Sequence, residues 1–192
     1  MGLAIHKEKE KPRSIAFSHK LADIPNGGNI ATADLSGDRI LEGSPVGRDA
    51  NGLFHVIKTA KVMQTAGATA KTYIVAKGHH FNVGDIVTLK LGGAAYAISA
   101  IATNSTNADY DDITVGTTLT AAAVGDVLIQ AATSGAEAGA FKYAPIGMAG
   151  AEVEKSVNTF VDIVTIGQID ASRTNAAIGS VVSAALPLIK VI

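Results

Sequence analysis

The sequence contains no cysteine and no tryptophan, and only 5% of its residues are aromatic. Without cysteine the chain forms no disulfide, no thiolate metal site and no cysteine nucleophile. Its hydrophobic residues, 47% of the total, are therefore largely Ala, Val, Ile and Leu, which form flat surfaces more readily than aromatic-lined pockets. The chain has enough apolar residues for a core, but we expect neither a deep small-molecule site nor a cofactor.

The sequence also lacks an excess of either charge, since 16 Lys and Arg residues face 17 Asp and Glu residues for a net charge of -1. Binding to nucleic acid or to an anionic membrane through bulk electrostatics needs an excess of positive charge. The longest apolar stretch, 178–189, is interrupted by Gly179 and Pro187 and is shorter than the roughly 20 residues that span a bilayer. We therefore expect no nucleic-acid partner and no membrane partner.

Familiar catalytic signatures are missing, namely a Gly-x-Ser-x-Gly elbow, a phosphate-binding loop and a His-Glu-x-x-His helix. His19 and His55 could each be matched with an acidic residue, but such pairs arise by chance in a sequence of this composition. A hydrolase acting on cell-surface polymers would need two carboxylates at a defined separation, which a sequence does not reveal. We expect no catalytic residues and no enzymatic activity.

The adjacent histidines His79 and His80 suggest a metal site, but the suggestion is weak. Neighbouring residues on a strand point to opposite faces and cannot readily share one ion, and no familiar ligand set is completed nearby. A polar turn before Phe81 is the favoured interpretation, with no metal site expected.

Three acidic residues, Asp109, Asp111 and Asp112, form a second candidate for cation binding. An EF-hand register that begins at Asp111 would place Ala122 where the bidentate glutamate belongs. A solvated loop is therefore the better interpretation of this cluster.

The most informative feature that is present is a nearly repeated phrase. It reads Val-Gly-Asp-Ile-Val at 83–87 and Val-Gly-Asp-Val-Leu at 124–128. Glycine allows a positive φ and aspartate can hydrogen-bond nearby backbone, so the phrase predicts a tight turn that leads into a buried strand. Because it occurs only twice, it does not predict a solenoid.

Further patterns predict strands and turns. Asp49-Ala50-Asn51-Gly52 is typical of a type I turn closed by a left-handed glycine, so two strands should meet there as a hairpin. β-branched and aromatic residues predict five short strands that would form a small barrel or sandwich. These strands are expected at 72–76, 86–89, 95–101, 113–115 and 127–129.

Near the C-terminus, 160–166 has the composition of a strand, with Gly167 extending or bending it. For 175–186 a helix is favoured by its alanines and by Pro187 as a stop, while Val181 and Val182 keep a strand as the alternative.

The predicted fold class is mainly β, with a β-rich base, an inserted small β-barrel or sandwich, an extended N-terminal arm and a short C-terminal helix. We assign the arm to residues 1–37, the base to 38–69 and 131–192, and the inserted unit to 70–130. A disordered terminus is the alternative to the arm, because terminal segments are loose unless something holds them.

Two sets of side chains suggest contact surfaces. Arginine suits bidentate contacts across an interface, although surface solubility is the favoured role for any one of Arg39, Arg48 and Arg173. A glycan-binding face on the inserted unit would use Tyr73, Tyr96 and Tyr110.

The stretch from Leu41 to His55, LEGSPVGRDANGLFH, and the stretch from Lys77 to Asp85, KGHHFNVGD, resemble head fibre and head decoration proteins of tailed bacteriophages. The resemblance extends from about Leu35 to the C-terminus, and its motifs are structural rather than catalytic. No residue role is transferred from it.

This resemblance implies an auxiliary virion protein, made in the host cytoplasm and located on the outside of an icosahedral head. Such proteins decorate and stabilise the shell or project from it, bind the major capsid protein, often through an extended arm, and are often trimers. The expected partners are thus the major capsid protein and further copies of this chain. A glycan-binding head projection is the alternative function.

Overall fold

The computed structural model describes residues 15–157 and 159–192, and this part of the chain is mainly β. Its strands form an eight-stranded sheet, which we call the main sheet, a six-stranded sheet, which we call the barrel sheet, and a two-stranded pair. One 3-10 helix, η1 (Ala171–Arg173), and one α-helix, α1 (Ser180–Ala185), complete the described part. Neither is long and apolar enough to cross a membrane. The predicted mainly β fold is confirmed.

The main sheet has the strand order β1-β15-β12-β4-β5-β2-β14, with β16 beside β15. Its strands are β1 (Phe17–Asp23), β2 (Gly28–Ala31), β4 (Pro45–Arg48), β5 (Phe54–Val56), β12 (Ala144–Ala149), β14 (Thr159–Val161), β15 (Ile163–Ile169) and β16 (Ile189–Val191). Only Asp162 separates β14 from β15, although the two strands lie near opposite ends of this order. The main sheet must therefore curl until its ends approach each other.

The single strand predicted at 160–166 is wrong at Asp162, where the structure divides it into β14 and β15. At this corner the Asp162 carbonyl accepts a hydrogen bond from the Gly150 amide at 2.7 Å, and its carboxylate accepts one from Lys20 Nζ at 3.1 Å. These contacts come from distant segments, so the local composition does not reveal the break. Gly167 lies within β15, as expected of an extension.

Part of the predicted N-terminal arm belongs to the main sheet. Strand β1 pairs with β15, and β2 pairs with both β14 and β5. Residues 1–14 of the predicted arm lie outside the described residues. From residue 15 onward the arm assignment is corrected, because Phe17, Ile30 and Leu35 are buried in the core.

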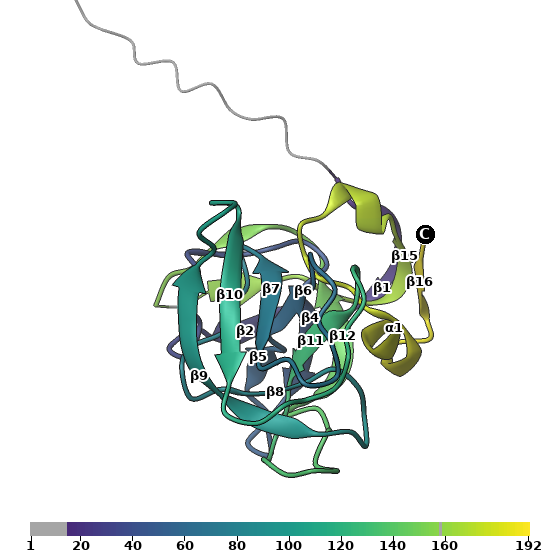
Figure 1. Ribbon diagram of the computed structural model, residues 1–192. Coiled ribbons are helices and arrows are strands. Elements are labelled where there is room, and N and C mark those ends of the chain that lie inside the picture. Colours follow the sequence, from purple (N-terminus) through teal and green to yellow (C-terminus); the bar gives the residue numbers. More distant parts are fainter. Residues whose placement is uncertain (1–14, 158) are drawn as a thin grey trace, which may run out of the picture.

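The barrel sheet has the order β6-β11-β8-β9-β10-β7 and curls until its outer strands meet at an isolated bridge between Val62 and Val75. Its strands are β6 (Thr59–Lys61), β7 (Thr72–Ala76), β8 (Ile86–Thr88), β9 (Ala95–Thr103), β10 (Tyr110–Val115) and β11 (Val127–Gln130). All five predicted strands are present, with β9 and β10 longer than expected. Figure 1 shows β9 and β10 in teal on the left, with β15, β16 and α1 on the right.

Strand β6 is not one of the predicted strands, and its residues fall within the predicted base. It joins the barrel sheet by pairing antiparallel with β11. The division into three units remains a prediction. Strand β6 shows that the chain passes from the main sheet into the barrel sheet close to residue 58. The small pair β3 (Arg39–Ile40) and β13 (Val153–Glu154) lies apart from both sheets in the strand pairing.

The two Val-Gly-Asp phrases form matching turns, as the sequence predicts. Gly84 and Gly125 both have φ 95°, and the carboxylates of Asp85 and Asp126 each accept a backbone N–H at 2.8 Å from three residues upstream. Each turn leads directly into a strand, β8 in the first case and β11 in the second. The Asp49 to Gly52 turn is also confirmed, since Gly52 has φ 85° and β4 pairs antiparallel with β5.

We expect Gly84→Ala and Gly125→Ala each to lower the free energy of unfolding by about 1–2 kcal/mol. A Cβ at either site meets no atom within 4 Å, so the cost arises from the positive φ and not from a clash. Gly116→Ala is the matched control, because its surroundings are equally open and its φ is not positive. Urea unfolding of the three variants tests this, and equal losses at all three sites would contradict it.

The C-terminal helix is confirmed but shorter than the predicted 175–186 range. Its N-cap is Gly179, whose Cα lies so close to Val127 that an added Cβ would come within 2.8 Å of the valine Cβ. Ala177, before the cap, is buried against the barrel sheet together with Val127 and Ile129. This packing holds 175–179 out of the helix, and Val182 anchors α1 to the main sheet.

Candidate functional site

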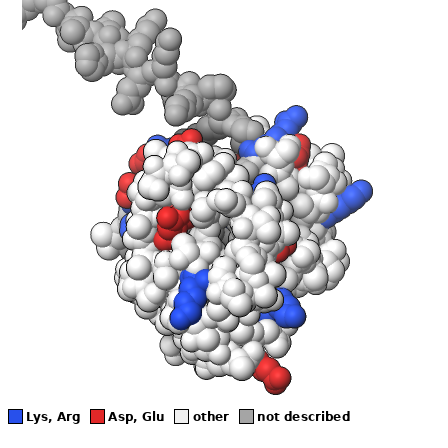
Figure 2. Space-filling view, in the orientation of Figure 1, with Lys and Arg blue, Asp and Glu red and all other residues white. Residues whose placement is uncertain are grey.

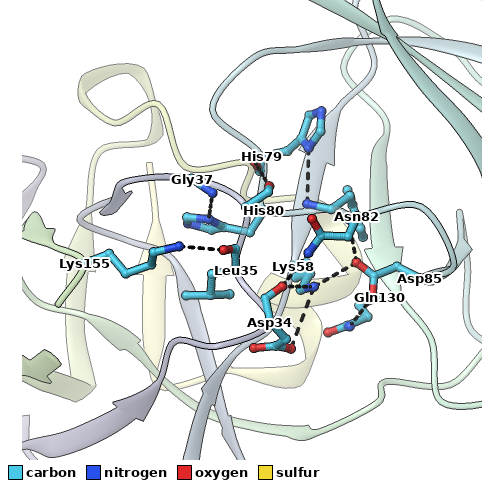
Figure 3. A network of polar contacts seen from close by, with 12 residues as sticks. Asp34, Leu35, Gly37, Lys58, His79, His80, Asn82, Asp85, Gln130 and Lys155 are labelled. Atoms are coloured by element: carbon cyan, nitrogen blue, oxygen red, sulfur yellow. Dashed lines mark hydrogen bonds and ion pairs between the residues drawn. The ribbon is translucent and has the colours of Figure 1, made fainter. Parts of the chain in front are cut away.

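The main sheet and barrel sheet are connected by a partly buried polar cluster, which we call the polar joint (Figure 3). It lies where the chain passes from β5 to β6, and a strap of residues 34–38 crosses over it. Its members are Asp34, Leu35, Gly37, Lys58, His79, His80, Asn82, Asp85, Gln130 and Lys155. Buried polar side chains need partners, and distant segments supply most of those that Lys58, His80 and Gln130 require, although His80 Nε2 and Gln130 Oε1 have no hydrogen-bond partner.

Lys58 is the central cation of the polar joint and is only 1% exposed. Its Nζ donates to Asp85 Oδ2 at 2.8 Å and to the Asp34 carbonyl at 2.5 Å, with Asp34 Oδ2 at 3.7 Å. The Asp85 carboxylate also accepts from the Asn82 backbone N–H at 2.8 Å and from Gln130 Nε2 at 3.3 Å. The aspartate of the first Val-Gly-Asp turn thus stabilises both its own turn and the connection between the sheets.

The strap is held mainly through its backbone. Besides Lys58, the side-chain Nδ2 of Asn82 donates to the Asp34 carbonyl at 2.6 Å. Lys155 Nζ donates to the Leu35 carbonyl at 2.8 Å. The Lys155 backbone N–H donates to the Asp38 carbonyl at 2.7 Å. Leu35, 4% exposed, inserts between these contacts into the core of the main sheet. Opening the strap would therefore expose both polar and apolar groups.

His79 and His80 lie in the loop between β7 and β8, which matches the predicted polar turn before Phe81. His80 Nδ1 accepts from the Gly37 N–H at 3.2 Å, whereas His79 Nδ1 accepts from the Phe81 N–H at 3.2 Å. Burial, reinforced by Lys58, lowers the pKa of His80 to about 4. Burial also lowers the pKa of His79, against the opposing influence of Asp111.

The three clustered aspartates do not converge on one point. Asp111 Oδ2 lies 3.4 Å from His79 Nε2, while Asp112 accepts from Asn104 Nδ2 at 2.7 Å. Asp109 is exposed, and the other two occupy successive positions of β10 rather than the predicted loop. Within 15–157 and 159–192, no three His, Asp or Glu side chains are grouped to hold a metal ion.

The remaining histidines lie apart. His55 Nε2 is 3.4 Å from Asp49 Oδ2, and the His55 ring stacks on Tyr143 with centroids 4.0 Å apart. His19 is exposed on β1. Backbone hydrogen bonding from Leu53 is the main cause of a lowered Asp49 pKa, so this carboxylate serves the turn that it caps.

The three arginines each contact their own chain. Arg39 pairs with Glu152 at 2.7 Å, which raises its pKa, and with Glu154 at 3.2 Å. The Arg48 guanidinium lies over the Phe54 ring at 4.4 Å, and Arg173 pairs with Asp170 at 3.2 Å. They lie on different elements and do not form one cluster.

The predicted tyrosine face is corrected at Tyr73, which is fully buried at 0% exposure. Its hydroxyl donates to the Thr120 carbonyl at 2.9 Å and accepts from the Leu119 N–H at 3.3 Å. Tyr96 and Tyr110 are half-buried, and Tyr96 packs against the barrel core. Tyr73 is therefore not available to a glycan-binding face.

The polar joint itself was missed by the sequence reasoning. Lys58 stands between apolar Ile57 and the strand Thr59–Lys61, and a lysine in an apolar run is a weak signal for a buried cation. The other signal, Asp85 in the Val-Gly-Asp phrase, predicts only a turn. Their pairing across 27 residues is visible only in the folded chain.

One strand of the main sheet is exposed along nearly its whole length. In β1, five of the seven residues are exposed, and Leu21 reaches 75% exposure. Among the described strands β1 pairs only with β15, and it stands at one end of the sheet order. Ile15, 67% exposed, precedes it at the point where residues 1–14 enter the described structure.

In comparisons with known proteins, no family model, no curated protein and no solved structure matched this chain.

Proposed function

We propose that this chain is a structural protein that decorates the outside of a tailed-phage head, attached to the major capsid protein and acting as a homo-oligomer, with a trimer favoured. The sequence resemblance to head fibre and head decoration proteins suggests this function. The observation that supports it best is β1, an exposed terminal strand at the point where the N-terminal segment enters the main sheet.

A strand with an exposed edge is suited to binding an extended partner. Its unpaired backbone groups can add a further strand, and the alternate side chains then set specificity. The exposed Leu21 and Ile15 would supply apolar contact beside that edge. We therefore propose that residues 1–14 and the outer edge of β1 together form the attachment surface.

The distribution of charge on the surface suits a protein that binds its partner through many contacts of moderate strength. On the face in Figure 2, charged side chains are scattered among uncharged ones and form no large patch of one sign. An oligomer that binds a repeating shell gains from high effective concentration, so each single contact can be weak.

We expect deletion of residues 1–14 to reduce occupancy on purified heads of the encoding phage while leaving the fold intact. Deletion of 1–37 would be a poor test, because it also removes β1 and β2 and the buried Phe17, Ile30 and Leu35. Leu21→Glu should weaken binding to heads about ten-fold, because it places a charge beside the proposed contact edge. Co-sedimentation with heads lacking the protein measures both effects.

The matched control is Leu91→Glu, which introduces the same charge at a leucine 49% exposed beside the barrel sheet. This variant should bind heads like the unaltered protein. Full occupancy by both the deletion and Leu21→Glu, or an equal loss with Leu91→Glu, would contradict the proposed attachment surface.

A further inference from the structure

The strap closes onto a histidine that has cationic neighbours. His80 is 5% exposed and belongs to the loop that carries Asn82 and Asp85, where its ring contacts the strap. Lys58 from the β5 to β6 connection, Lys155 from the segment after β13 and His79 from the same loop disfavour a positive charge on its ring. Asp34 on the strap is the one neighbour among these that favours it.

The hydrogen bond between His80 and the strap requires a neutral ring. Nδ1 accepts from the Gly37 N–H, so the proton of the neutral imidazole must be on Nε2. A cavity of about 20 Å³, large enough for one water molecule, borders both histidines. Protonation would turn Nδ1 into a donor facing another donor and would add a third cation between two lysines.

We propose that the strap of residues 34–38 is an acid-released latch, in which protonation of His80 breaks its bond to Gly37 and frees the strap from the polar joint. Release exposes Leu35 and removes the contacts that tie the strap to Lys58 and Lys155. The inference concerns the isolated chain and holds whether or not the chain binds phage heads.

The direction of the pH dependence follows from linkage. The pKa of His80 is about 4 in the closed form and about 6.5 when the ring is free, so the closed form has full stability above pH 6.5. Stability is lost as the pH falls from 6.5 towards 4 and changes no further below that range. Between pH 7 and pH 5 the opening equilibrium should increase about 20-fold.

The test is amide hydrogen exchange of the full chain at pH 7 and pH 5, corrected for the intrinsic pH dependence of exchange. Protection of the Gly37 and Lys155 amides, which bond to His80 and to the Asp38 carbonyl, should fall about 20-fold. The Val62 amide, bonded to Asp126 in the barrel sheet, should keep its protection. At pH 5 an ordinary aspartate, with a pKa of about 3.9, remains ionised.

His80→Asn is the decisive variant, because its side-chain oxygen can accept from Gly37 but does not titrate. It should reduce the pH effect at Gly37 and Lys155 to less than about two-fold. His19→Asn, at an exposed histidine of β1 outside the polar joint, should leave the 20-fold effect unchanged. A 20-fold effect that persists in His80→Asn would overturn the proposal.

The unaltered protein provides a test that does not depend on a variant folding. NMR titration of the ring should show His80 as the Nε2–H tautomer at pH 7 and still neutral in the closed form at pH 5. A His80 ring that is protonated at pH 5 while the Gly37 amide keeps its protection would show that the latch is wrong. Unchanged protection of the strap amides between pH 7 and pH 5 would show the same.

Discussion

Lys58→Met should lower the free energy of unfolding by about 3–5 kcal/mol at neutral pH. Methionine fills a similar volume, so the loss arises mainly from the missing ammonium group. The Asp85 carboxylate, 15% exposed, would lose its cation, and the Asp34 carbonyl would lose one of its two donors and keep only Asn82 Nδ2. A buried charge without its partner is costly because it is desolvated without compensation. Urea unfolding measures the change.

Two further variants isolate the cause. Lys61→Met makes the same substitution at an exposed lysine of the neighbouring strand β6 and should change stability by less than about 0.5 kcal/mol. Asp85→Asn combined with Lys58→Met removes both charges, while the side-chain oxygen at position 85 can still accept from the Asn82 backbone N–H. This double variant should recover about 1–3 kcal/mol relative to the sum of the single losses. Strictly additive losses would show that the two groups are not coupled.

Tyr73→Ala should destabilise the protein by about 3–5 kcal/mol, because it removes a fully buried ring from the core of the barrel sheet. The ring packs within the barrel core, and its hydroxyl holds the 119–120 segment against β7. The expected effect is on folding rather than on any binding surface. Thermal or urea unfolding tests it directly.

Tyr73→Phe separates the ring from its hydroxyl. We expect a loss of about 1–3 kcal/mol, because the Leu119 N–H and the Thr120 carbonyl lose a buried partner. Tyr110→Phe, at a half-buried tyrosine of β10, is the control and should cost less than about 0.5 kcal/mol. A larger loss at Tyr110 than at Tyr73 would contradict this account of the barrel core.

Local patterns predicted much of the barrel sheet. Strand β7 has the predicted bounds, and both Val-Gly-Asp phrases form left-handed turns that lead into β8 and β11. These features depend on neighbouring residues, namely glycine at positive φ, a carboxylate that caps its own turn and β-branched runs. The same reasoning failed for β1, because five of its seven residues are exposed and its register with β15 is irregular. An edge strand of this kind has no alternating pattern to detect.

The polar joint shows why a candidate site is harder to predict than a strand. Lys58, His80 and Lys155 lie far apart in the sequence, and each has an ordinary neighbourhood there. Their joint role depends on the strap crossing above them, which in turn depends on how the main sheet curls. The sequence suggests only a weak metal site for the histidine pair, whereas the structure gives the two rings different backbone partners.

The sequence by itself determined the mainly β fold class and the positions of the tight turns, and it favoured a helix before Pro187, because these follow from the backbone preferences of adjacent residues. Only the tertiary structure decided that β1 and β2 belong to the main sheet, that β6 belongs to the barrel sheet and that Lys58 is buried beside Asp85. Those features depend on pairing between distant segments, and the free energy of burial and charge compensation that selects them exists only after the sheets have come together.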